Sequence, residues 1–202
     1  MPIERNIKMN TELNILICGV GGQGTLLASR LLGEVLKEQG LDVKVSEVHG
    51  MSQRGGSVVT YVRSGQKVYS PIIEKGGADI ILAFEQLEAA RWLPYLKKGG
   101  RLVMNTGSIE PMPVITGAME YPEGIVDKIN KLGVNLTTID ALSPAIDAGS
   151  AKAVNVVLIG ALSRFMQLGH ECWQAAIKRT VPERFQAMNL TAFNSGAESV
   201  PQ

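Results

Sequence analysis

Glycines at a fixed spacing stand out near the start of the sequence. Gly19, Gly21 and Gly24 fit the pattern G-x-G-x-x-G between an apolar run and an amphipathic segment. In a strand–turn–helix unit the first glycine allows a tight turn, the second lets backbone approach a bound group, and the third lets the helix pack on the strand. Free N–H groups at the start of such a helix attract an anion, usually a phosphate. Gly22 and Gln23 lie within the same pattern, so all five residues are candidate cofactor-binding residues; the alternative is a structural turn without a ligand.

A second stretch, 49–56, combines an imidazole, an amide and a guanidinium with glycines. It follows a predicted strand, where open α/β sheets bind their ligands. Arg54 can bind a phosphate or carboxylate through two parallel N–H groups, and the glycines would let backbone close around such a group. We therefore add Gln53, Arg54, Gly55 and Gly56 to the candidate cofactor-binding residues. The alternative is a surface loop with Arg54 in solvent.

An acidic residue, Glu47, stands near the end of the predicted second strand. Dinucleotide-binding units place the acid that holds a ribose hydroxyl about 20 residues after the glycines. A solvated carboxylate at the end of a strand is the alternative interpretation. Asp140 repeats this placement at the end of a later predicted strand.

Other catalytic patterns are missing from these 202 residues. There is no G-x-S-x-G or H-E-x-x-H motif, and no lysine follows the first glycine stretch as in a P-loop. The two cysteines, Cys18 and Cys172, form no C-x-x-C pair, so the chain alone cannot bind an iron–sulfur cluster or a zinc ion of the usual spacing. The net charge of +1 gives no general attraction to nucleic acid. We therefore predict no catalytic residue and no metal ligand, but a ligand cleft in a chain of the reducing cytoplasm.

The hydrophobic periodicity predicts the elements that position these residues. Strands are expected near 15–18, 43–48, 78–84, 101–105 and 134–139, a hairpin over 57–63 and 67–69, and helices over 26–38, 85–96 and 123–131. The prolines in 109–124 predict a looped excursion with a short strand around 114–115. The fold class is α/β: a Rossmann-like, mostly parallel sheet with an inserted β-hairpin and a C-terminal helical segment.

The C-terminal segment is predicted as three helices, 152–168, 171–179 and 182–193. Gly160 within an apolar helix indicates close approach of another helix or chain, and Asn155 is interpreted as a hydrogen-bonded amide of the core. The longest apolar run, 153–162, is too short to span a bilayer. We expect a flexible N-terminus at 1–12, a single domain over 13–193 and a flexible tail at 194–202.

Three sequence blocks carry a resemblance to a known family. They are Gly19–Gly24 with the following Leu26-Leu27-Ala28, the stretch from Gly50 to Val58, and the helical 155–162 segment with the terminal 189–193. From about residue 13 to 193 the chain resembles the gamma-type subunits of 2-oxoacid:ferredoxin oxidoreductases, and among them the small (beta) subunits that act on indolepyruvate.

The resemblance implies a subunit of an enzyme that oxidatively decarboxylates a 2-oxoacid, forms an acyl-CoA and passes electrons to ferredoxin. Thiamine diphosphate and iron–sulfur clusters are then expected on a larger partner subunit, and coenzyme A is expected at this chain's two glycine stretches, with Arg54 facing an anion. The isolated chain would be inactive. Apart from the resemblance, Gly160 in an apolar helix and the edge of the hairpin offer contact surfaces, so a homodimer of the isolated chain is expected. Two alternatives stay open: a self-contained NAD(P)-binding oxidoreductase, and a non-catalytic interaction subunit whose glycine turn is empty.

Overall fold

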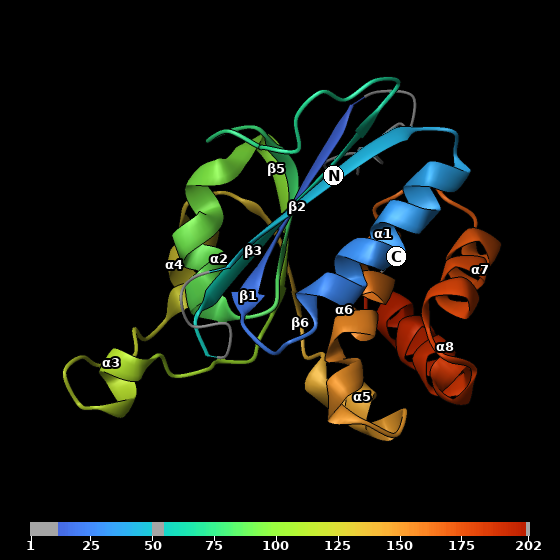
Figure 1. Cartoon of the computed structure of the whole chain (residues 1–202). Helices are drawn as coiled ribbons and strands as arrows, with labels where there is room; N and C mark the ends of the chain where they lie inside the picture. The colour runs from blue at the N-terminus through green and yellow to red at the C-terminus, as the bar shows by residue number, and fades with distance from the viewer. Residues whose placement is uncertain (1–11, 50–54, 201–202) are drawn as a thin grey trace.

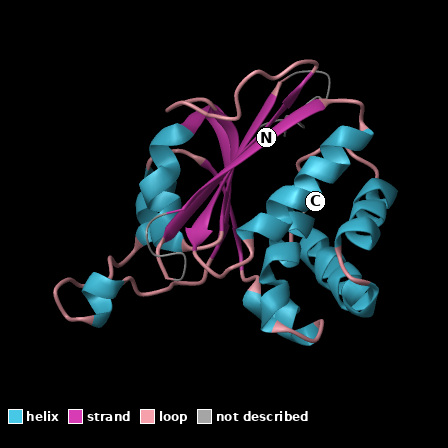
Figure 2. Cartoon of the chain, viewed as in Figure 1, coloured by secondary structure: helices cyan, strands magenta, loops and turns pink. Residues whose placement is uncertain are grey.

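A central sheet with helices on both faces forms the body of the molecule (Figure 1). The computed structural model describes residues 12–49 and 55–200. One face of the sheet is covered by α2 (Gln86–Trp92) and α4 (Ile125–Lys131), and the other by α1 (Thr25–Glu38), α6 (Val154–Ser163), α7 (His170–Thr180) and α8 (Glu183–Glu198), as Figure 2 also shows. The predicted α/β class is therefore confirmed.

The remaining elements complete this framework. The strands are β1 (Leu13–Val20), β2 (Asp42–His49), β3 (Ser57–Gly65), β4 (Ala78–Ala83), β5 (Leu96–Asn105) and β6 (Asn135–Ile139). The short helices are η1 (Leu93–Tyr95), α3 (Met112–Ile115), α5 (Leu142–Asp147) and η2 (Ala151–Ala153). None of the helices in the described part of the chain is long and apolar enough to cross a membrane.

The six strands lie in the order β2-β3-β1-β4-β5-β6. The β1–β4, β4–β5 and β5–β6 pairs are parallel, whereas β3 is antiparallel to both β1 and β2. The sequence correctly predicts an antiparallel strand inserted after the second strand. The partner that it predicts for this inserted strand, residues 67–69, is wrong. Residues 67–69 form no strand, and β3 lies between β2 and β1 instead.

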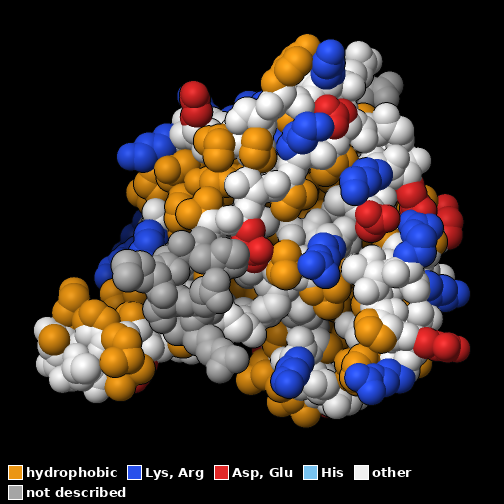
Figure 3. Space-filling model, viewed as in Figure 1, with side chains coloured by type: hydrophobic (Ala, Val, Ile, Leu, Met, Phe, Trp, Pro, Cys, Tyr) orange, Lys and Arg blue, Asp and Glu red, His pale blue; other side chains and the backbone are white. Residues whose placement is uncertain are grey.

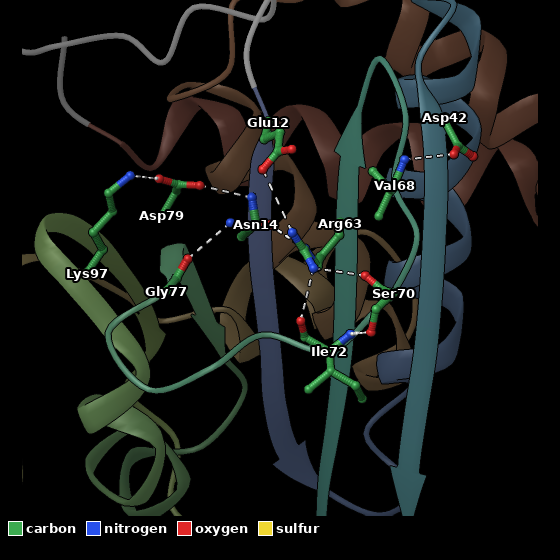
Figure 4. Close-up of polar contacts among 10 residues, drawn as sticks. All are labelled: Glu12, Asn14, Asp42, Arg63, Val68, Ser70, Ile72, Gly77, Asp79 and Lys97. Carbon is green, nitrogen blue, oxygen red and sulfur yellow. Dashed lines mark hydrogen bonds and ion pairs between the residues drawn. The ribbon is translucent and has the colours of Figure 1, made fainter.

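Side chains of β2 and β3 hold the loop that follows β3 in place (Figure 4). The Val68 N–H donates to the Asp42 carboxylate at 2.9 Å. Arg63 Nη1 donates to the carbonyl groups of Ser70 at 2.9 Å and Ile72 at 3.2 Å. Side chains of β2 and β3 thus bind backbone groups between residues 68 and 72, and the chain continues as a loop to β4.

The alternation of side chains along the buried strands divides the apolar core into two clusters. Ile15 and Ile17 of β1 pack with the helices α1, α6 and α8, while Leu16 and Cys18 pack with the side that carries α2 and α4. Successive residues of a strand point to opposite faces, so a continuous apolar run such as β1 supplies both clusters. This pattern is typical of a strand covered on both faces.

Helices α6 and α8 cross at two glycines. A Cβ atom on Gly160 would lie 2.0 Å from the carbonyl oxygen of Phe193, and one on Gly196 would lie 1.9 Å from that of Val157. The close approach predicted at Gly160 is therefore confirmed. The predicted helix end at Phe193 is wrong, because α8 continues to Glu198, and Gly196 and Val200 are buried.

Candidate functional site

The first glycine stretch forms the turn between β1 and α1. Gly22 and Gly24 adopt φ angles of 105° and 84°, which glycine tolerates and L side chains rarely adopt. A Cβ atom on Gly19 would lie 2.9 Å from the Cβ of Phe84, so this position needs glycine for packing. Close approach of Phe84 thus accounts for glycine at position 19, and backbone geometry accounts for glycine at positions 22 and 24.

The side chain of Gln23 holds this turn closed. Its Oε1 accepts a hydrogen bond from the Val20 N–H at 2.7 Å, and its Nε2 donates to the carbonyl of Phe84 at 3.1 Å. Gln23 therefore joins the end of β1 to the end of β4, and its amide positions the turn.

The N-terminus of α1 has no capping side chain. Its N-cap residue is Gly24, no side chain accepts a hydrogen bond there, and the first turn contains no acidic residue. The first N–H groups of a helix have no partner within the helix, and the helix dipole favours an anion beside them. This end of α1 therefore offers donors to a ligand.

A cavity of about 780 Å³ opens beside this helix end, at the carboxyl edge of the sheet. Its walls come from five segments: the glycine turn with the start of α1, the end of β5 with the residues after it, the start of α5, the η2–α6 region, and the start of α8 with the residues just before it. The lining residues are Gly22, Gln23, Gly24, Leu27, Asn105, Gly107, Ser108, Ile109, Leu142, Ser150, Ala151, Lys152, Ala153, Val154, Asn155, Val181, Pro182, Phe185, Met188 and Asn189.

The chemistry of the cavity is mixed. Leu27, Val181, Phe185 and Met188 give it apolar walls, while Lys152 contributes an exposed cation. Such a combination fits a long ligand that carries both an apolar portion and an anionic group.

Two asparagines fix the segments that line the cavity. Asn155 Nδ2 donates to the Gly24 carbonyl at 3.3 Å, and its Oδ1 accepts from the Val156 N–H at 2.8 Å. Asn105 Nδ2 donates to the Phe84 carbonyl at 3.1 Å, and its Oδ1 accepts from the Ala141 N–H at 3.1 Å. The interpretation of Asn155 as a hydrogen-bonded core amide is confirmed, but sequence reasoning missed that it supports the glycine turn.

The described part of the second glycine stretch lies directly against the first. The Gly21 N–H donates to the Gly56 carbonyl at 2.8 Å, and the Gly55 N–H donates to the Gly21 carbonyl at 3.2 Å. Gln53 and Arg54 lie outside the described residues. Of the nine candidate residues, Gly22, Gln23 and Gly24 line the cavity, whereas Gly19, Gly21, Gly55 and Gly56 are not among its lining residues.

Neither of the two candidate acids is among the residues that line the cavity. Glu47 of β2 is level with Thr60 of β3, which in turn is level with Ile17 of β1, so a whole strand separates Glu47 from the strand that carries the glycines. Glu47 is therefore not placed beside the glycine turn, where an acid that binds a ribose hydroxyl is expected. Asp140 accepts hydrogen bonds from the first turn of α5, and the bond donated by the Ser143 hydroxyl lowers the pKa of its carboxyl group.

Two buried acids that the sequence analysis did not select lie at the N-terminus of α2. Glu85 is 1% and Glu88 4% exposed. Glu85 accepts hydrogen bonds from the Glu88 N–H at 2.9 Å, from the Ile109 N–H at 3.3 Å and from the Tyr121 hydroxyl. Glu88 accepts from the Ser57 hydroxyl and pairs with Arg91 at 3.0 Å. Nothing in a single sequence distinguishes these acids from solvated residues at the start of a helix.

The described residues contain no cluster of side chains that could bind a metal ion. No group of three or more His, Cys, Asp and Glu side chains there could hold a metal ion. Burial, and then the carboxylates of Glu88 and Glu85, raise the pKa of the Cys18 thiol well above its usual value. Since thiolates are the ligands of iron–sulfur clusters, Cys18 is poorly suited to that role.

The sequence matches the family model described as pyruvate ferredoxin/flavodoxin oxidoreductase over residues 14–199. The chain belongs to this oxidoreductase family. It is 42% identical over 198 residues to "Indolepyruvate oxidoreductase subunit IorB" of Thermococcus kodakarensis, a match that covers 95% of this chain and 97% of that protein.

Solved structures of the same oxidoreductase class share the fold. The gamma subunit of a keto/oxoacid ferredoxin oxidoreductase from Geobacter sulfurreducens superposes with a TM-score of 0.69 at 25% identity, covering 93% of this chain and 97% of that one. A 2-oxoglutarate:ferredoxin oxidoreductase from Magnetococcus marinus, solved with 2-oxoglutarate, coenzyme A and succinyl-CoA, gives a TM-score of 0.72 at 23% identity. That match covers 94% of this chain but 31% of the other, so the same fold is there one part of a longer polypeptide.

Proposed function

We propose that this chain is the small subunit of a 2-oxoacid:ferredoxin oxidoreductase that acts on indolepyruvate, and that its cavity encloses part of coenzyme A. The family match over residues 14–199 and the 42% identity to an indolepyruvate oxidoreductase subunit support the assembly and the substrate. The cavity beside α1 supports the binding role. A larger subunit would carry the thiamine diphosphate and the iron–sulfur clusters in a cytoplasmic complex that passes electrons to ferredoxin.

The cavity suits the two chemical parts of coenzyme A. The uncapped N-terminus of α1 and the Lys152 ammonium favour phosphate groups. The apolar wall around Phe185 and Met188 suits the pantetheine arm. When bound, coenzyme A supplies the thiol that accepts the acyl group. This chain's residues would hold the carrier and exclude water, since its cavity combines an anion-binding helix end with apolar walls.

A charge-removal experiment tests the proposal. In the complex reconstituted with its larger subunit, Lys152→Ala should raise the KM for coenzyme A about tenfold, with little change in the KM for the 2-oxoacid. Lys131→Ala, on the opposite layer of the molecule, is the matched control. Calorimetric titration of the complex with coenzyme A should show the same loss of affinity.

Several results would contradict the proposal. Oxidoreductase activity of this chain by itself would show that it needs no partner subunit. Equal coenzyme A affinity of the Lys152 and Lys131 variants would show that coenzyme A does not bind in this cavity. Substrate choice is tested separately by comparing indolepyruvate with 2-oxoglutarate and 2-oxoisovalerate. A preference for either of the latter acids would contradict the substrate assignment.

A further inference from the structure

A projecting arm, residues 106–124, stands away from the body of the molecule. It leaves the carboxyl end of β5, forms the single-turn helix α3 and returns to α4 (Figure 1). The predicted short strand around 114–115 is wrong, because these residues belong to α3. The arm is bonded internally: the Ile115 N–H donates to the Pro111 carbonyl at 3.1 Å, and the Met119 N–H donates to the Pro113 carbonyl at 3.0 Å.

Both ends of the arm are fixed to one buried carboxylate. Glu85 accepts from the Ile109 N–H at 3.3 Å and from the hydroxyl of Tyr121. The 11 residues between these two anchors therefore leave and return at the same point, the N-terminus of α2. A segment held in this way presents its side chains in a defined arrangement, which lowers the entropic cost of binding.

The arm exposes large apolar side chains to solvent. Met112 is 64%, Ile115 62% and Met119 66% exposed. Met112 and Ile115 are three residues apart in a helical turn and so lie on the same side. Figure 3 shows hydrophobic side chains gathered on this projecting lobe. Contiguous apolar surface rimmed by polar residues marks interaction sites in folded proteins.

The charge of the arm indicates the kind of surface that covers it. No lysine or arginine occurs between Arg101 and Lys128, whereas Glu110 and Glu120 flank α3 and are exposed. An arm-to-arm contact between two copies would bring these acids against their own symmetry mates. A partner with an apolar groove and a basic rim fits better.

We propose that the arm is a docking element for the larger subunit of the oxidoreductase, and that it inserts α3 into an apolar groove flanked by Lys or Arg residues. This inference rests on the proposed function. In the Magnetococcus marinus neighbour the same fold is part of a longer chain, so further polypeptide adjoins it there. Ile109 belongs both to the arm and to the lining of the cavity, so a subunit that holds the arm also lies beside the cavity.

A matched pair of triple variants tests the docking role. Met112→Ser/Ile115→Ser/Met119→Ser removes the apolar surface of the arm. Tyr69→Ser/Ile72→Ser/Leu132→Ser removes exposed side chains elsewhere, at 84%, 49% and 69% exposure. Binding to the larger subunit is measured by surface plasmon resonance, and circular dichroism verifies that both variants fold. We expect the arm variant to lose at least tenfold in affinity and the control variant less than twofold.

Reversing the charge of the two acids that flank α3 gives a second test of the docking role, through the rate of association. Glu110→Lys/Glu120→Lys should slow association with the larger subunit several-fold at low salt, with a smaller effect at high salt. Glu34→Lys/Glu74→Lys, on other surfaces, should change the association rate less than twofold.

The outcomes separate the two proposals. If the unmodified chain binds the larger subunit and the arm variant binds equally well, the docking role is overturned while the proposed function stands. If the unmodified chain binds no larger subunit, both are overturned. If sedimentation instead shows that the unmodified chain dimerises and the arm variant does not, with subunit binding unchanged, a second copy is the occupant and our assignment is wrong.

Discussion

The hydroxyl of Tyr121 shows how one residue can hold a long segment in place. It donates to the buried Glu85 carboxylate, which also accepts from the Ile109 N–H. Desolvation, and then this hydrogen bond, raise the pKa of the Tyr121 phenol above its usual value. The folded state therefore holds the phenolic proton more tightly than the unfolded chain does.

The sign of the pH dependence follows from this shift. Below the unfolded pKa of about 10, both states are protonated and the stabilisation is complete. As the pH rises above about 10, the unfolded chain loses its proton first, so the free energy of unfolding falls. Tyr121→Phe removes this titration. It should cost about 1.5–3 kcal/mol at pH 7, through the lost hydrogen bond to a charged group, and should make the alkaline decline shallower.

Urea unfolding at pH 7, 9 and 10.5 checks this expectation. Tyr69→Phe is the control, because Tyr69 is 84% exposed. An alkaline decline equally steep in the Tyr121 and Tyr69 variants would contradict the assignment. Tyr61, whose pKa burial also raises, leaves a residual slope in both.

At the scale of elements, two helical glycines have opposite consequences. Gly160 of α6 faces the backbone of α8, where a Cβ atom would lie 2.0 Å from the Phe193 carbonyl oxygen. Gly33 of α1 has no atom within 4 Å of the position of an added Cβ, apart from its chain neighbours and its own helix backbone. A methyl group is thus obstructed at one site and accommodated at the other.

Alanine substitution at these two positions gives a matched comparison. Gly160→Ala should destabilise the protein by about 3 kcal/mol or slightly less, because overpacking displaces backbone. Gly33→Ala should stabilise it by about 0.5–1 kcal/mol, because alanine loses less conformational freedom in a helix. Thermal and urea unfolding measure both. A Gly160→Ala protein as stable as the parent would show that α6 and α8 do not approach so closely.

The sequence predicted the elements whose periodicity is local. The apolar run at β1, the amphipathic α1 and the buried β4 are all found where expected. It could not predict the partner of β3, because pairing with β1 depends on residues about 50 positions apart, Leu13 and Ser64. The helix α5 was missed, since a six-residue segment carries too little periodicity to be recognised.

The site was predicted in part for the same reason. The glycine spacing is a local signal, and Gly22, Gln23 and Gly24 do line the cavity. Lys152 and Asn155 come from a segment about 130 residues further along, and only the folded chain brings them to the turn. The roles of Gln53 and Arg54 stay predictions, since both lie outside the described residues.

For the whole molecule, α8 connects the cavity to the far side of the helical layer. Its first turns contribute Phe185 and Met188 to the cavity wall, and its last turns contribute the buried Gly196, with Val200 buried just beyond the helix. The sequence analysis expects a flexible tail at 194–202; in the described part of that segment, 194–198 belongs to α8 and Val200 is buried.

Truncation tests the importance of this end. Deleting residues 194–202 should lower the free energy of unfolding by at least about 2 kcal/mol, because it removes the buried Val200 and the glycine contact with α6. Deleting only 201–202 is the control and should have little effect. Equal melting temperatures of the two shortened chains would show that the end of α8 contributes nothing to the helical layer.

The position of β3 also bears on how the chain folds during synthesis. β1, β2 and β3 all lie within the first 65 residues, so they leave the ribosome before β4 does. The antiparallel half of the sheet can therefore form first, and β3 then covers one edge of β1 while the other edge awaits β4. This order leaves β1 with a single unpaired edge during translation. Because unpaired strand edges promote aggregation, the early pairing with β3 lowers the risk that the growing chain aggregates.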